Sequence, residues 1–146
     1  GGSSADSLQV IYSTFNQVGW EYDAAQGAYL RSQDKADGSG ALYPTLENLT
    51  GEQLAFENVL VLFADHHFVK PTIIEINLMF VEEQRGLLFR DGLVFPVTWS
   101  TLRGELRLTD GLGNPRPLKP GQTFLEVVSY QTTWNPDSLI IRYHNP

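Results

Sequence analysis

Asp65, His66 and His67 are the one place in this 146-residue chain where a carboxyl group lies beside imidazole rings. Such a cluster could hold a metal ion or exchange protons with a substrate. Adjacent residues of a strand point to opposite faces, however, so His66 and His67 can share a metal only if the backbone turns there. No third ligand is spaced nearby. We therefore expect a polar strand end and no metal, with Asp65, His66 and His67 as the candidate ligands if a metal does bind.

The residue types used by hydrolytic enzymes are present, but they lack the surrounding motifs. No Gly-x-Ser-x-Gly sequence marks any serine as a nucleophile. Glu82 and Glu83 precede Gln84 and Arg85, a run that is typical of a solvated turn. A glycosidase needs two acids that face each other across a cleft, which the sequence does not establish. We therefore expect no catalytic residues and no cofactor.

Composition bounds the class of protein. At 42% apolar and 12% aromatic residues, the chain can build a substantial core for one domain. Its formal charge of −7 argues against binding to a phosphate backbone, so we expect no nucleic-acid partner. The absence of cysteine excludes disulfides, thiolate metal sites and a cysteine nucleophile. The longest clean apolar run, residues 59–64, is far too short for a membrane span.

Alternation of apolar and polar residues predicts many short strands joined by turns, because side chains of a strand face opposite sides with a period of two. Asp91-Gly92 is the strongest hairpin signal, since both central positions of a type I′ turn need positive φ. Residues 33–44 are expected to form a long surface loop, and 45–53 could hold one helical turn after a Thr45 cap. Ten strands are predicted, at residues 8–13, 18–22, 28–32, 54–63, 72–81, 87–90, 93–99, 105–109, 123–129 and 138–143.

This pattern predicts a mainly β fold with at most one or two short helical turns. The expected architecture is a twisted antiparallel sheet that forms either a partly closed barrel or a sandwich. The first four residues, Gly-Gly-Ser-Ser, have the composition of a linker. We therefore expect one domain over residues 5–146, with 1–4 outside the fold.

Several segments occur in an order and spacing that resemble the C-terminal domain of the YerB-like family of bacterial lipoproteins. The similarity covers roughly residues 8–130. The segments are Gly27-Ala28-Tyr29-Leu30-Arg31, Leu49-Thr50-Gly51-Glu52-Gln53-Leu54, Glu57-Asn58-Val59, Gly86-Leu87-Leu88-Phe89-Arg90-Asp91-Gly92, Trp99-Ser100, Thr109-Asp110-Gly111 and Lys119-Pro120-Gly121-Gln122-Thr123-Phe124.

Two departures from the family's pattern matter. Where the family often carries Pro-His-x-Asp, this chain reads Leu42-Tyr43-Pro44-Thr45-Leu46-Glu47, so any role of that histidine is lost. Where the family tends to place Trp, the chain has Phe124, which keeps an apolar side chain.

The resemblance implies a protein outside the cytoplasm that is anchored to the membrane through a lipid in its full-length form. A longer N-terminal domain would precede this one, and the anchor would lie outside the present chain. No activity of the family is implied. Expected partners are a cell-wall glycan or peptide, an envelope protein, or the protein's own N-terminal domain.

Arg31, Asn58, Trp99 and Asp110 fall within the resembling segments at strand positions, which makes them candidate ligand-binding residues. A functional interpretation places Arg31 and the aromatics Trp20, Tyr29, Tyr43 and Trp99 around a cleft that binds a glycan or peptide by stacking and hydrogen bonding. A structural interpretation has Asn58 satisfying a bulge or neighbouring loop and Asp110 capping its turn. In it, Trp99 fills the core and Arg31 pairs with an acid.

Three functions therefore stay open. The first is a non-enzymatic module of the cell envelope that binds through an aromatic face or through the loop at residues 33–44. The second is a hydrolytic enzyme acting on envelope polymers, with Asp65, His66 and Glu75 as acid and base groups. The third is a structural module that supports the N-terminal domain, which would show as a large exposed apolar surface.

Overall fold

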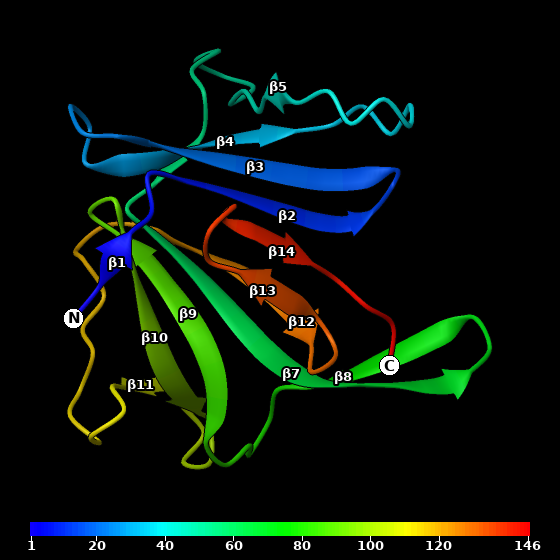
Figure 1. Ribbon diagram of the computed structural model, residues 1–146, viewed down its shortest axis with the longest axis vertical. Helices are drawn as coiled ribbons and strands as arrows, with labels where there is room; N and C mark the ends of the chain where they lie inside the picture. The colour runs from blue at the N-terminus through cyan, green and yellow to red at the C-terminus, as the bar shows by residue number, and fades with distance from the viewer.

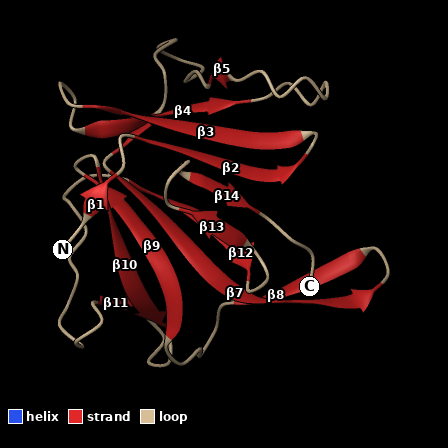
Figure 2. Ribbon diagram, viewed as in Figure 1, coloured by secondary structure: helices blue, strands red, loops and turns tan.

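The alternating sequence forms fourteen strands and no helix in the computed structural model, which describes all 146 residues (Figure 2). Sheet A contains β1 (Ser3–Ser4), β7 (Asn58–Lys70), β8 (Ile73–Asn77), β9 (Gln84–Arg90), β10 (Leu93–Ser100), β11 (Arg107–Thr109) and β12 (Thr123–Ser129). Sheet B contains β2 (Ser7–Ser13), β3 (Asn16–Asp23), β4 (Ala28–Gln33), β5 (Tyr43–Pro44), β6 (Ala55–Phe56), β13 (Thr133–Asn135) and β14 (Ile140–Arg142).

The two sheets form a sandwich, which decides between the two predicted architectures. Sheet A has the order β1-β10-β9-β7-β12, and sheet B has the order β13-β14-β2-β3-β4-β5. Both sheets are mixed, because β7 pairs in parallel with β12 and β2 pairs in parallel with β14. The chain begins in sheet A with β1, forms sheet B from β2 to β6, returns to sheet A from β7 to β12 and ends in sheet B with β13 and β14. In Figure 1, β2 to β5 of sheet B lie above sheet A. The mainly β prediction is confirmed.

Two apolar clusters hold the sandwich. Fourteen buried residues from both sheets form the larger cluster, including Val10, Tyr29, Phe63 and Phe89. A second cluster of seven, around Trp99, covers the other face of sheet A. The central strand β7 supplies side chains to both clusters over Val59–Ala64, so it is buried on both faces as its continuous apolar sequence predicts.

The turn chemistry places most strands where the sequence predicts them. Asp91 and Gly92 both have positive φ, 55° and 72°, and join β9 to β10. Asn48–Thr50 form a turn closed by a hydrogen bond from the Gly51 N–H to the Glu47 carbonyl, not a helix.

The strands differ from the prediction at several places, and the segment predicted as one strand over 54–63 is divided at Glu57 between β6 of sheet B and β7 of sheet A. Ser3 and Ser4 pair with Val94 and Leu93 of β10, so part of the segment expected outside the fold belongs to sheet A. The strand predicted over 72–81 ends at Asn77, because the chain turns at Leu78–Phe80. The short strands β5 and β13 were not predicted, and β5 lies at the end of the segment expected to be a surface loop.

One hairpin of sheet A extends beyond the sandwich. The register of β12 with β7 ends at Ala64, and that of β9 ends at Leu62, so from Asp65 onward β7 pairs only with β8. We call residues 65–77 the arm. Figure 1 shows it projecting from the body, with the C-terminus beside its base and the N-terminus on the opposite side of the molecule. The chain forms no helix with the length and apolar character that a membrane crossing needs.

Candidate functional site

The aromatic residues Trp20, Tyr29 and Trp99 are all buried. The indole N–H of Trp99 donates to the Phe63 carbonyl at 3.2 Å, and the Tyr29 hydroxyl donates to the Ala5 carbonyl at 2.8 Å. A side chain that is enclosed in this way does not meet a ligand without local unfolding. Trp99 fills a core cluster, as its structural interpretation predicts.

Asn58 fastens a neighbouring loop to the start of β7. Its side-chain amide donates to the Lys119 carbonyl at 2.8 Å, and its Oδ1 accepts from the Lys119 N–H at 2.9 Å. Asn58 is fully buried. Both halves of the amide are thus satisfied by the backbone of one residue, which confirms the structural interpretation.

Asp110 caps its own turn. Its Oδ1 accepts the backbone N–H groups of Leu112 at 2.8 Å and of Asn114 at 3.0 Å. These two hydrogen bonds lower the pKa of the Asp110 carboxyl below its ordinary value. The carboxylate is therefore occupied by its own loop.

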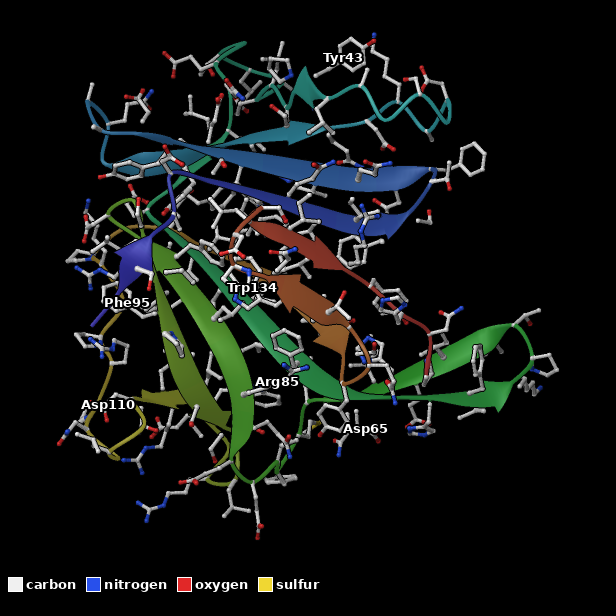
Figure 3. The ribbon with its side chains drawn as sticks, viewed as in Figure 1. Tyr43, Asp65, Arg85, Phe95, Asp110 and Trp134 are labelled. Atoms are coloured by element: carbon white, nitrogen blue, oxygen red, sulfur yellow. The ribbon has the colours of Figure 1, made fainter.

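Arg31 has no acid within ion-pair distance, so the prediction that it pairs with one is wrong. Its guanidinium donates to Thr45 Oγ1 and Gln33 Oε1, both at 2.9 Å, and lies 5.3 Å from the centre of the Phe124 ring. Tyr43 is exposed, and Lys35 lies over its ring. Figure 3 shows Tyr43 and Asp110 at opposite ends of the molecule. Of the five residues predicted to surround one cleft, Trp20, Tyr29 and Trp99 are buried and only Tyr43 is exposed, so the five do not line an open cleft.

The two histidines point apart, as strand alternation predicts. His67 lies 3.2 Å from Asp65 and 3.5 Å from Glu75 on the exposed arm. His66 is buried, with its Nδ1 3.0 Å from the Ala64 carbonyl and its ring against Tyr143. The acid and base groups of the hydrolytic alternative are thus not gathered, because Asp65 and Glu75 approach His67 and not His66. The structure groups no three His, Cys, Asp or Glu side chains in an arrangement that could hold a metal ion.

Sequence reasoning missed a buried carboxylate that joins the two sheets. Glu126 of β12 accepts hydrogen bonds from the Tyr12 hydroxyl and from the Trp20 indole N–H, the latter at 3.3 Å. Burial raises the pKa of Glu126, and the two hydrogen bonds and the nearby Arg31 charge offset this only in part. The sequence does indicate this burial, because strand alternation places Glu126 on the same face as the apolar residues Phe124 and Val128.

The two faces of the arm differ, because Phe68, Ile74 and Ile76 lie on one, whereas the other carries the polar pair His67 and Glu75 together with the apolar Ile73. The register puts Phe68 opposite Ile74 and His66 opposite Ile76, and on the other face His67 lies opposite Glu75. Phe68 remains 46% exposed, although it is the largest apolar residue of the hairpin. The other exposed apolar residues of the arm are Val69, Ile73 and Ile76.

The loop that follows the arm is both apolar and held in place. Met79 is 70% and Phe80 65% exposed. Phe80 has a φ of 54°, which costs energy for a bulky side chain. Thr101 fixes the loop on either side, because its hydroxyl donates to the Leu78 carbonyl at 2.7 Å and accepts the Val81 N–H at 3.0 Å. We call the exposed side chains of Phe68, Val69, Ile73, Ile76, Leu78, Met79 and Phe80 the apolar arm surface.

Comparison with known proteins places the chain in a family. The model of the C-terminal domain of a protein of unknown function, DUF3048, matches residues 8–125. The chain belongs to this family. The Bacillus subtilis (strain 168) protein named "Putative lipoprotein YerB" is 29% identical over 126 residues, which are 84% of this chain and 35% of that protein. The crystal structure of YerB from the same organism is similar with a TM-score of 0.70 at 26% identity, over 86% of this chain and 41% of that one.

The DUF3048 domain described here thus spans about a third of its relative's length. The resemblance found from the order of short motifs is confirmed. Two of the motif residues serve the fold, since Asn58 fastens a loop and Trp99 fills a core cluster. Phe124, at the position where the family tends to place Trp, packs 5.1 Å from the Trp20 ring and keeps the aromatic contact.

Proposed function

We propose that this domain is a non-enzymatic interaction module of a lipoprotein in the cell envelope, and that its arm packs against the N-terminal part of the same lipoprotein. The apolar arm surface carries this proposal. Residues 68–80 expose seven apolar side chains on one hairpin and its following loop. Exposed apolar groups gathered in this way are typical of protein interaction sites.

The construction of the arm also calls for a partner. A two-stranded ribbon is at best marginally stable in water, because it cannot bury its apolar face by itself. Residues 66–70 of β7 have β8 as their only neighbour in the sheet. A third layer over Phe68 and Ile76 would bury apolar area worth about 25 cal/mol per Å².

The length of the relative YerB indicates which partner covers the arm. The matching family model describes a C-terminal domain, and YerB is about three times as long as the matched segment. We therefore take the preceding part of a YerB-like chain as the occupant. The name of the relative supports a location outside the cytoplasm, with a lipid anchor in the longer protein.

Hydrogen exchange tests this proposal residue by residue. The amides of residues 66–77 should exchange at least about tenfold more slowly in the longer lipoprotein than in the isolated domain, because docking adds to the free energy of opening. The double substitution Phe68→Ser and Ile76→Ser should remove that difference. Leu49→Ser, at an exposed residue outside the arm, is the matched control and should leave the difference unchanged.

Two outcomes would overturn the proposal. Equal exchange of the arm in both proteins would show that the N-terminal part does not cover it. Protection that rises with the concentration of the isolated domain, together with a doubled mass in sedimentation, would identify a second copy as the occupant.

A further inference from the structure

A polar cleft opens at the end of sheet A where β10 and β11 meet. Its volume is about 520 Å³, and Leu102 is its only apolar side chain. This size lies within the range of small-ligand sites, but those are mostly apolar. A polar cleft of this kind fits a small, charged ligand better than an apolar one.

The floor of the cleft is set by strand register. Thr98 lies directly opposite Thr109, and Ser100 lies directly opposite Arg107, so these four side chains share one face of the β10–β11 ribbon. Trp99 and Leu108 alternate with them and point to the other face, where they pack in the apolar cluster around Trp99. The floor therefore rests on a buried layer, which holds the hydroxyl groups in position.

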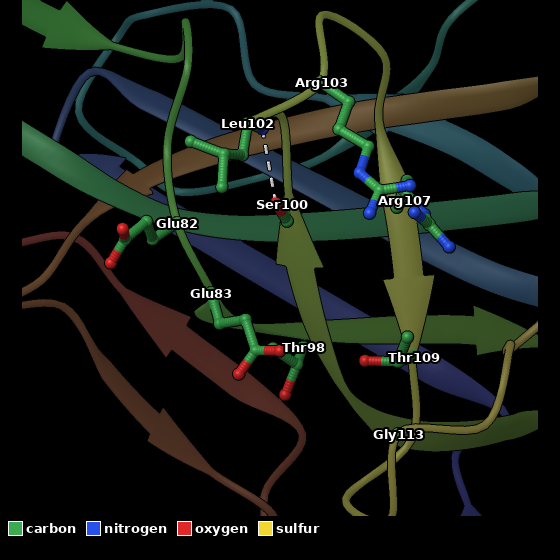
Figure 4. A pocket seen from close by; sticks show the side chains of 9 residues that line it. All are labelled: Glu82, Glu83, Thr98, Ser100, Leu102, Arg103, Arg107, Thr109 and Gly113. Atoms are coloured by element: carbon green, nitrogen blue, oxygen red, sulfur yellow. Dashed lines mark hydrogen bonds between the residues drawn. The ribbon is translucent and has the colours of Figure 1, made fainter.

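The two walls carry opposite charges. Glu82 and Glu83 follow Val81, whose carbonyl accepts the Ser100 hydroxyl at 3.1 Å and whose N–H donates to Thr101. Arg103 comes from the turn between the strands, and Arg107 from β11. Figure 4 shows the glutamates on one side of the cleft and the arginines on the other, with Thr98 and Thr109 between them.

The opposite charges do not neutralise each other. None of the four ion pairs of the molecule includes Glu82, Glu83, Arg103 or Arg107. Both guanidinium groups are also without a hydrogen-bond acceptor from the protein, although arginine is suited to bidentate pairing with a carboxylate. The cleft thus presents a positive and a negative wall across a row of hydroxyl groups.

We propose that this cleft binds a short peptide that has both a free amino and a free carboxyl group. The ammonium group lies at Glu83, the carboxylate at Arg103 and Arg107, and the intervening peptide group at the hydroxyls of Thr98 and Thr109. The glutamates repel a purely anionic ligand, and the arginines repel a purely cationic one. A zwitterion avoids both repulsions and is therefore favoured. This site is separate from the arm and does not depend on the proposed docking.

The test uses trialanine in four forms: free, N-acetylated, C-amidated and blocked at both ends. Titration followed by the backbone amide signals should shift Thr98, Arg107 and Thr109 with the free peptide. Blocking either end should weaken binding at least about tenfold, because each blocked end loses a charge-assisted hydrogen bond. Added salt should weaken binding as well, since the site is exposed.

Paired variants assign each end. Glu82→Gln with Glu83→Gln should abolish discrimination against the acetylated peptide, and Arg103→Gln with Arg107→Gln should abolish discrimination against the amidated one. Glu52→Gln and Arg142→Gln, exposed residues outside the cleft, should bind as the unchanged domain does. Equal affinity for all four peptides, or amide shifts that fall elsewhere in the molecule, would overturn the proposal.

Discussion

At the scale of single residues, Asn58 shows how a polar side chain can be required inside an apolar strand. Replacement by Ala would remove two hydrogen bonds to the N–H and the carbonyl of the part-buried Lys119 and would leave a cavity at a fully buried position. We expect a loss of about 1 to 3 kcal/mol in the free energy of unfolding, since each such hydrogen bond contributes about 0.5 to 1.5 kcal/mol. Urea denaturation measures it. Asn16→Ala, at an exposed position, is the control, and an equally small effect of both changes would contradict this role.

Glu126 makes the stability of the domain depend on pH in the direction opposite to ordinary acid denaturation. Its pKa in the folded state is raised above the ordinary 4.5 by burial, so the folded protein holds this proton more tightly than the unfolded chain. The contribution of Glu126 to stability is therefore fully present below pH 4.5 and is lost as pH rises through the raised pKa. We expect the stability of the unchanged domain, relative to Glu126→Gln, to fall with rising pH across that window. Urea midpoints at several pH values measure it, and parallel curves would contradict it.

Residue types predicted local roles better than they predicted contacts across the core. The turn-capping role of Asp110 follows from its place before Gly111, and the structure confirms it. The partner of Glu126 lies 114 residues away at Tyr12, on the opposite sheet, and no local pattern contains that distance. The prediction of an acid partner for Arg31 rests on charge pairing as the common solution. In the structure its two terminal nitrogens donate to Thr45 and Gln33 and the group lies near the Phe124 ring, while its buried Nε has no partner.

At the scale of elements, the arm is a separable part of the fold. Neither apolar cluster contains a residue between Ala64 and Val81. We expect that replacing residues 67–75 by Asn-Gly will leave the domain folded, because His66 and Ile76 are directly opposite and a two-residue turn can join them. The expected change in the free energy of unfolding is within about 1 kcal/mol, since the removed residues are exposed apart from the half-buried Ile74. Circular dichroism and thermal denaturation test this, and loss of the folded spectrum would show that the arm is needed for folding.

Strand prediction succeeded where turn chemistry and alternation agreed. Asp91-Gly92 sets the register of β9 and β10 through backbone angles that few residues adopt. The segment 72–81 alternates just as well, but the strand ends at Asn77, because Phe80 takes a left-handed conformation and Thr101 binds the loop. Alternation in that segment predicts that the strand has two different faces. It does not predict whether the apolar face is buried or exposed.

At the scale of the whole molecule, strand pairing between distant segments determines the architecture. The parallel pairs β7–β12 and β2–β14 join parts of the chain about 65 and 131 residues apart, as in Asn58 with Thr123 and Gln9 with Ile140. No turn signal marks such a pairing, so the sequence left barrel and sandwich equally open. Contacts of this separation slow folding, because loop closure must precede them.

The strand nearest the C-terminus, β14, should be required for stable folding of both sheets. Ile141 is fully buried in the larger core cluster together with Val59 and Phe89 of sheet A, and β14 pairs with both β2 and β13. We expect that removal of residues 138–146 will abolish slow hydrogen exchange in β9 as well as in β2, although β9 lies in the other sheet. Removal of residues 145 and 146 alone is the control, because it keeps the His144 carbonyl that accepts the Ser129 hydroxyl. Retained protection in β9 would mean that sheet A folds without the closing strand, so that the sandwich is two units and not one cooperative domain.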